Sequence, residues 1–152
     1  MLKNWFNERD ATDVLRRLER LSATAQPKWG ALTPSTLVCH LADPVRLALG
    51  EKSASRVRSP IGLPGIAHLV VWVLPWPKGA PAAPEFLPGT GMTPPGDFER
   101  DKRTLVDLLK RFSAVPADRA LVSNPVFGSL SRRAWGRLMW RHLDHHLRQF
   151  DL

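Results

Sequence analysis

Tyrosine is absent from this chain of 152 residues, and cysteine occurs once, as Cys39. Without tyrosine, no phenol can act as an acid or base. A single cysteine forms no disulfide within the chain and builds no cysteine-rich zinc cluster. This composition is typical of proteins in a reducing compartment, so we expect a cytoplasmic location.

Long hydrophobic runs are also scarce. The longest, residues 66–76, is interrupted by His68 and Pro75 and reaches about half of the ~20 apolar residues that a membrane-spanning helix needs. The first ten residues mix charged and apolar side chains and lack the apolar core of a signal peptide. We therefore expect neither a membrane span nor export by that route.

Positive charge is abundant, with a formal net charge of +8 at pH 7. The basic residues are dispersed along the chain, mostly on the polar faces of predicted helices and often beside acidic residues. This distribution favours solvated helix faces over a nucleic-acid surface. The length and a hydrophobic content of 43% suit one globular domain, which we expect to span residues 1–152.

Apolar residues recur at helical spacing in four long segments, two of them in the first third of the chain. The first is predicted to begin near Asp10, which can cap it, and to end before Pro27. The second has clearer limits. Thr33 offers a capping hydroxyl before a proline at the first helical position, and Gly50 is a typical stop.

The other two helices lie in the second half of the chain. One is predicted from about residues 95–98 to 115, and the last from Ser129 or Ser131 to the end of the chain. Between the second and third long helices, residues 59–96 are rich in proline and glycine around one short apolar helix. Long excursions of this kind often form a binding wall or lid. We expect an all-α fold, an antiparallel four-helix bundle with this excursion.

Three of the five histidines fall within five positions of the last helix. At about 100° per residue, His142 and His146 share its apolar face with Leu138 and Met139, one turn apart, whereas His145 lies at the edge of that face. The opposite arc carries mostly arginine and acidic residues. Two imidazoles at this spacing can reach one metal ion.

The second helix directs His40 to its apolar face, so facing helices of a bundle would bring His40 to His142 and His146. Three imidazoles leave coordination positions open for water or substrate, as in catalytic zinc sites. Each histidine taken alone also fits a hydrogen-bonded core residue. The three together favour a metal site, because unpaired imidazoles are costly to bury.

Three further side chains are candidates for a catalytic role. Asp43 follows His40 by one helical turn and can accept a proton from a ligand imidazole or act as a base. His145 can carry protons, and Gln149 can orient a ligand or substrate through its amide. Each also fits an ordinary solvated or hydrogen-bonded residue. Cys39 points about 100° away from His40, and we interpret it as a packing residue.

The chain resembles the DinB-like (DinB/YfiT) superfamily of metalloenzymes, in a branch of unknown function. The stretches that carry the resemblance are PKWG at 27–30, LVCHLAD at 37–43, LPWPKG at 74–79, NPVFG at 124–128, WG at 135–136 and HLDHHLRQF at 142–150. The last is the most specific. Two positions depart from the pattern: Pro44 stands where a helix former is expected, and Asn124 where many relatives carry histidine.

The resemblance implies a four-helix bundle with a divalent metal, Zn or Ni, held by His40, His142 and His146. It also implies a thiol S-transferase that uses a low-molecular-weight thiol, or a related hydrolase. A metal site of this kind would activate a thiol or water toward a small-molecule substrate. Two alternatives stay open: a non-catalytic metal- or ligand-binding stress-response module acting through a homodimer, and a basic nucleic-acid-binding module.

Overall fold

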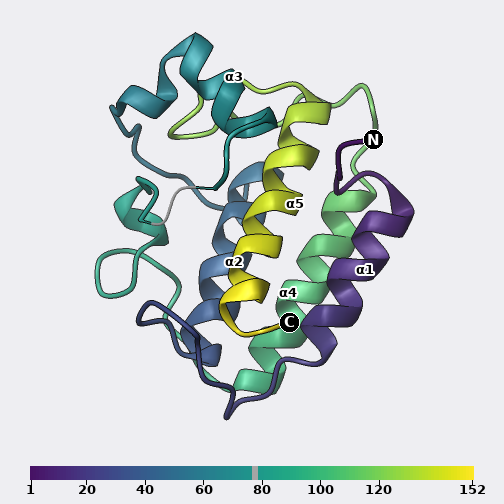
Figure 1. Ribbon diagram of the computed structural model, residues 1–152, viewed down its shortest axis with the longest axis vertical. Helices are drawn as coiled ribbons and strands as arrows, with labels where there is room; N and C mark the ends of the chain where they lie inside the picture. Colours follow the sequence, from purple (N-terminus) through teal and green to yellow (C-terminus); the bar gives the residue numbers. More distant parts are fainter. Residues whose placement is uncertain (77–78) are drawn as a thin grey trace.

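The structure is a computed structural model that describes residues 1–76 and 79–152. Within these residues it is all-helical, without a β-strand (Figure 1). The helices are α1 (Glu8–Glu19), α2 (Pro34–Leu49), α3 (Pro64–Trp72), α4 (Phe98–Ser113) and α5 (Arg132–Gln149), with short 3₁₀ turns η1 (Pro60–Gly62) and η2 (Pro84–Phe86). Pro77 and Lys78, which belong to one of the resembling stretches, lie outside the described residues. None of the helices in the described part of the chain is long and apolar enough to cross a membrane.

Local capping sets the ends of the long helices. Thr33 and Thr36 form a reciprocal capping box at the start of α2, and Gly50 ends it in a left-handed conformation, as predicted. Ser131 caps α5, in agreement with one of the two predicted starts. The predicted cap of α1 was wrong: the helix begins at Glu8, two residues before Asp10, and Asn7 is the cap, whereas Asp10 lies inside the first turn and accepts from Asn4 N at 2.9 Å.

Helices α2 and α4 pack side by side and run in the same direction (Figure 1). Near their starts, Cys39 Sγ lies 3.8 Å from the Asp101 carboxylate, and near their ends Glu51 pairs with Arg111. Residues 50–97 carry the chain back along the molecule before α4 begins. The prediction of an antiparallel four-helix bundle is therefore confirmed only as an all-helical fold, because α3 is a fifth helix and a long connection allows parallel neighbours.

Helix α5 lies at the centre of the molecule and packs against α1, α2 and α3. Trp135, Leu143 and Leu147 are almost fully buried on it. Arg137 and Arg141 are buried as well, although the helical pattern assigned both to a solvated arc. The N-terminal segment and α3 cover that arc, and they supply backbone carbonyls as hydrogen-bond acceptors to the two guanidinium groups.

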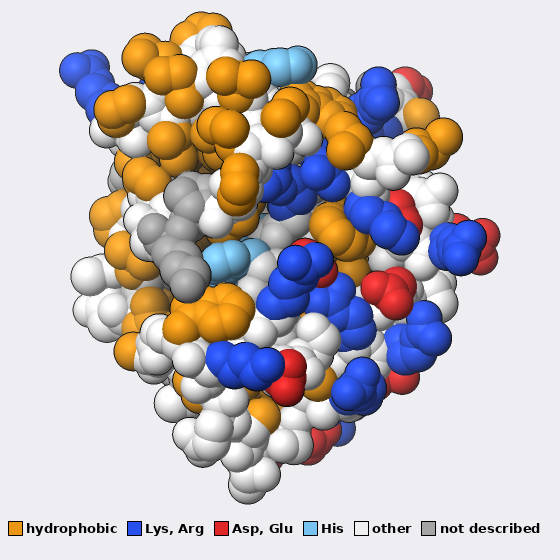
Figure 2. Space-filling model, viewed as in Figure 1, with side chains coloured by type: hydrophobic (Ala, Val, Ile, Leu, Met, Phe, Trp, Pro, Cys, Tyr) orange, Lys and Arg blue, Asp and Glu red, His pale blue; other side chains and the backbone are white. Residues whose placement is uncertain are grey.

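The surface is divided by polarity. Figure 2 shows hydrophobic side chains gathered over the end of the molecule that carries α3, and Lys, Arg, Asp and Glu side chains mixed on the side of α1 and α5. The exposed apolar residues on and beside α3 are Leu63, Ile66, Leu69, Val73 and Leu74. Several basic residues on the other side pair with acids, as the largely buried Arg17 does with Asp144 at 2.8 Å.

Candidate metal centre

The three predicted histidines come together between α2 and α5. His40 Nε2 lies 3.1 Å from His142 Nε2 and 3.1 Å from His146 Nε2. The nearest ligand atoms of the three rings all lie within 4.8 Å of one another. Metal–nitrogen bonds of about 2.0–2.1 Å place neighbouring ligand nitrogens about 2.9–3.4 Å apart in octahedral or tetrahedral geometry. The cluster can hold a metal ion.

The hydrogen bond of His40 fixes which of its nitrogens carries the proton. Its Nδ1 lies 2.9 Å from the backbone oxygen of Phe86, which can only accept, so Nδ1 carries the hydrogen. The neutral ring then has a bare lone pair on Nε2, pointing toward the other two histidines. Phe86 belongs to η2, so the long connection orients a histidine of α2.

Gln149 fixes the tautomer of His146 in the same way. Its amide Nε2 donates to the backbone oxygen of Trp29 at 2.6 Å, which leaves Oε1 to accept from His146 Nδ1 at 2.9 Å. The reversed amide would place two acceptor oxygens against each other. His146 therefore also presents a bare lone pair at Nε2, and the two lone pairs of His40 and His146 face each other at 3.1 Å with no proton between them. A cation between them would remove this repulsion.

Burial keeps the three rings uncharged. Desolvation lowers the pKa of His40, lowers that of His142 well below its usual value, and lowers that of His146 to about 3. The neighbouring imidazoles lower the values of His142 and His146 further. Neutral imidazole is the form that binds metals, so the apo site is already in its ligating protonation state at neutral pH.

A glycine lets the backbone pass close to Gln149. Gly30 has φ +77°, and a Cβ at this position would overlap Gln149 Nε2. Two residues earlier, the backbone N of Lys28 donates to the backbone oxygen of Gln149 at 2.7 Å. The PKWG stretch at 27–30 therefore holds the amide that orients His146, which is a physical reason for its sequence.

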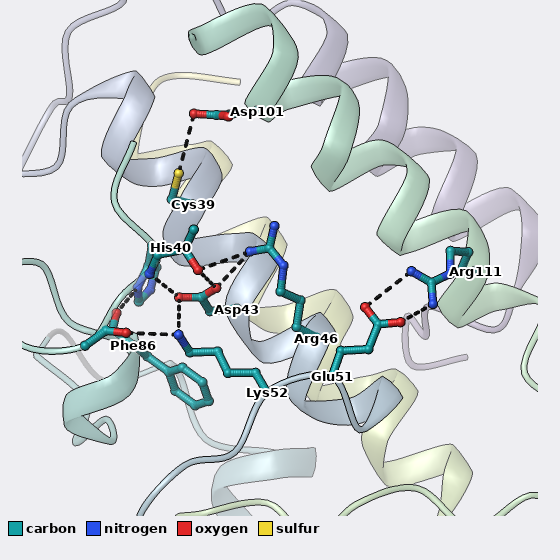
Figure 3. Close-up of polar contacts among 11 residues, drawn as sticks. Cys39, His40, Asp43, Arg46, Glu51, Lys52, Phe86, Asp101 and Arg111 are labelled. Carbon is teal, nitrogen blue, oxygen red and sulfur yellow. Dashed lines mark hydrogen bonds and ion pairs between the residues drawn. The ribbon is translucent and has the colours of Figure 1, made fainter. Parts of the chain in front are cut away.

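Asp43, a predicted partner or base, is fully buried on α2 but is engaged elsewhere. Its carboxylate accepts from Thr93 N at 2.8 Å and from Arg46 at 2.9 Å, and pairs with Lys52 at 3.3 Å; Figure 3 shows it between the two cations. Among the described hydrogen bonds, none joins this carboxylate to an imidazole, although its negative charge partly offsets the lowering of the His40 pKa by burial. Its contacts tie the segment before α4 to α2.

A cavity of about 290 Å³ opens onto the three histidines. Residues 79–83 and 86–88 of the long connection form one wall, and the loop at 124–127 forms another. Leu138 and Met139 of α5 line its interior, and Pro44 contributes from α2, which continues through this proline to Leu49. The excursion, predicted to form a binding wall or lid, thus forms a wall of this cavity.

His145 lies at this cavity, beside the cluster. Its ring centroid is 5.0 Å from that of His146, 6.1 Å from Trp29 and 6.3 Å from Trp76. Asn124, one of the departures from the family pattern, accepts from Val126 N at 2.9 Å and from Phe127 N at 3.0 Å. It thereby shapes its own loop at the cavity wall.

Two residues at the site were missed from the sequence. Arg141 donates to the backbone oxygens of Val70 at 2.5 Å and Val71 at 3.1 Å, and also to that of Leu74, at the C-terminal end of α3. Its guanidinium lies 5.7 Å from the ring of Trp76, which in turn lies 5.9 Å from His142. No local signal identifies them, because their partners are distant in the sequence.

Cys39 lies in the core and is not one of the clustered residues. Burial and the nearby Asp101 carboxylate raise the pKa of its thiol to about 11. A thiol that stays protonated at neutral pH is a poor nucleophile and a poor metal ligand. The interpretation of Cys39 as a packing residue agrees with this environment.

Comparison with known proteins gives one match. A family model described as "Protein of unknown function (DUF1569)" matches residues 79–151. The match covers the cavity wall from Gly79 onward, α4, and α5 with His142 and His146, whereas His40 on α2 lies outside it. Neither the curated proteins nor the solved structures gave a match to this chain. Residues 79–151 are thus similar to a family whose description names no function.

Proposed function

We propose that this protein is a metal-dependent enzyme in which His40, His142 and His146 hold a divalent ion, Zn or Ni. The observation that carries the proposal is the pair of facing lone pairs on His40 and His146, 3.1 Å apart, with both Nδ1 protons committed to oxygen acceptors. Two hydrogen-bonded core histidines would instead share a proton. Oriented, neutral imidazoles are the donor set that such an ion prefers.

The surroundings of the three histidines suit a catalytic metal site better than a site that only stores a metal ion. Three protein ligands leave positions that face the cavity, and a divalent ion bound there would supply Lewis acidity and lower the pKa of a bound water or thiol. Phe86 and Gln149 hold the imidazoles of His40 and His146 in place, and apolar side chains line the cavity beside them. His145 would carry protons between this cavity and solvent.

The reaction class follows from the site and from the family resemblance together. The chain offers no nucleophile with an adjacent base at the cavity among the described residues, so water or an external low-molecular-weight thiol is the proposed nucleophile. This corresponds to a hydrolase or a thiol S-transferase of the DinB-like type acting on a small molecule. The three histidines occupy the positions that the resemblance assigns to its metal ligands.

Elemental analysis of protein purified without a polyhistidine tag tests the proposal. We expect near-stoichiometric metal in the wild type and none in the His142→Ala/His146→Ala double variant. His68→Ala is the matched control, because His68 is exposed on α3 away from the cluster, and it should retain the metal. Absence of metal from the wild type after reconstitution with Zn and Ni would overturn the assignment.

A panel of thiol-conjugation and hydrolysis assays then tests catalysis. Turnover by the metal-loaded wild type, lost in the double variant and kept in His68→Ala, is the expected result. A protein that binds metal but turns over no substrate in either assay class would instead support the ligand-binding module.

A further inference from the structure

The cavity beside the three histidines is lined almost entirely by uncharged, apolar groups. Among the described lining residues there is no lysine, arginine, aspartate or glutamate. The apolar side chains that form it include Leu32, Trp76, Phe86, Leu87, Phe127 and Leu138. A ligand filling this space exchanges water for hydrocarbon contacts, which favours binding in proportion to the apolar area buried.

Two charged residues of the described chain that directly neighbour lining residues in the sequence, Arg141 and Asp43, are already committed to other partners. Arg141, adjacent to His142, donates to the backbone oxygens of Val70 and Val71. Asp43 is held by Thr93 and Arg46. Neither side chain lines the cavity, so neither is placed to neutralise a charge on a bound molecule.

The polar groups that do line the cavity gather at the histidines. Asn124 uses its side-chain oxygen on the backbone of its own loop, at Val126 and Phe127. The imidazoles of His40, His142, His145 and His146 therefore form the polar end, and the long connection with the 124–127 loop forms the apolar end. A second charged group on a ligand would lose its hydration without gaining a partner among the described lining residues, which weakens binding.

We infer that the molecule recognised here has one polar or metal-ligating end directed at the histidines and an uncharged, apolar body. As a statement about substrate, this rests on the proposed function. It narrows that function to substrates with an uncharged, apolar body, because the described residues of the apolar walls offer no partner for a carboxylate or phosphate.

A matched pair of probes tests the inference: methyl 2-naphthyl sulfone, which is neutral, and 6-(methylsulfonyl)naphthalene-2-sulfonate, which has the same sulfone end and ring system but carries a negative charge at the far end of the ring. Their dissociation constants are measured by calorimetry, with the protein as purified and after Zn addition. We expect the neutral sulfone to bind at least tenfold more tightly in both forms. Equal or tighter binding of the sulfonate, or no binding of either probe, would overturn the inference.

A charge variant confirms the location. Leu87 lines the cavity and is 40% exposed, so a lysine there can be solvated without loss of the fold. Leu87→Lys should improve binding of the sulfonate, so that the ratio of the two dissociation constants falls at least threefold. Leu63→Lys adds the same charge at a 57% exposed leucine outside the cavity and should leave the ratio of the two dissociation constants unchanged. Equal effects of the two variants would place the probe elsewhere and overturn the inference.

These outcomes separate the inference from the proposed function. Neutral-probe preference in a protein that retains no metal would support the selectivity of the cavity while removing the metal-dependent function. Stoichiometric metal binding together with tighter binding of the sulfonate would support the metal-dependent function and overturn the inference about the cavity.

Discussion

Gln149 lies one turn after His146 on α5, and its carboxamide oxygen accepts the Nδ1 proton of His146 at 2.9 Å. The amide nitrogen of the same side chain is fixed by the Trp29 backbone oxygen at 2.6 Å. A segment that precedes α2 therefore determines which nitrogen of a histidine on α5 faces the cluster. These two hydrogen bonds, from Gln149 to Trp29 and to His146, can be tested without changing any of the three histidines.

Gln149→Leu removes the acceptor and keeps an apolar side chain of similar size. Loss of such a partner typically weakens metal binding by about 10–100-fold. We expect this loss in competitive Zn titrations with a chromophoric chelator. The control Gln26→Leu changes an exposed glutamine and should bind Zn like the wild type. Unchanged affinity in Gln149→Leu would mean that His146 does not depend on this hydrogen bond.

Gly30→Ala should disturb the same hydrogen bonds, because Gly30 directly follows Trp29 and packs against the Gln149 amide. Its Cβ would overlap the amide of Gln149, and its φ of +77° is unfavourable for alanine. Gly89→Ala is a matched control, because Gly89 has φ +80° but open space around it. Both variants should lose about 1 kcal/mol from the backbone, and Gly30→Ala should lose at least ~1 kcal/mol more in urea denaturation. Equal losses would show that Gln149 moves aside without cost.

Metal-free protein should lose stability as the pH falls below neutrality. An unfolded histidine titrates near 6.5, whereas burial lowers the pKa of His146 to about 3 in the folded chain. Between these values the unfolded state binds more protons, so the free energy of unfolding decreases with acidification, by at most about 1.4 kcal/mol per pH unit for this residue. The contribution is complete above pH 6.5.

The measurement is a series of urea denaturations of chelator-treated protein from pH 7.5 to 5. His146→Gln removes one titrating group and should give a shallower pH dependence than the wild type. His68→Ala, which removes an exposed histidine, should keep the wild-type slope. Identical slopes for His146→Gln and the wild type would contradict the burial of a neutral imidazole at this position.

Arg141→Met should loosen the wall of the cavity. The backbone oxygens of Val70 and Val71 lose their donor, at a cost of about 1–3 kcal/mol for buried groups left unsatisfied. Trp76 loses its neighbouring cation, so its fluorescence should change. Thermal denaturation and tryptophan emission measure the two effects. Arg148→Met removes an exposed arginine paired with Asp144 and should cost less than about 1 kcal/mol; a similar cost for both variants would contradict the role of Arg141.

The parts of the fold that depend on neighbouring residues were predictable from the sequence. Capping by Thr33 and Ser131 and the stop at Gly50 are local, and the structure confirms them. The convergence of His40 with the two histidines of α5 was also predictable, because all three lie on apolar faces that must meet in the core.

The remaining features depend on contacts between distant segments. The burial of Arg141 contradicts its place on a polar arc, because its partners are carbonyl oxygens of α3, about 70 residues earlier in the chain. The shared direction of α2 and α4 depends on the path of residues 50–97, which no periodic pattern describes. The roles of Trp29 and Phe86 at the histidines use backbone oxygens, which every residue type has.

The connection between α3 and α4 touches the site in two ways. Phe86 gives its backbone oxygen to His40, while Leu87 and Pro88, directly after it, line the cavity. One stretch of backbone therefore sets both the shape of the cavity wall and the orientation of a histidine in the cluster, so a substitution that shifts this stretch should alter both together.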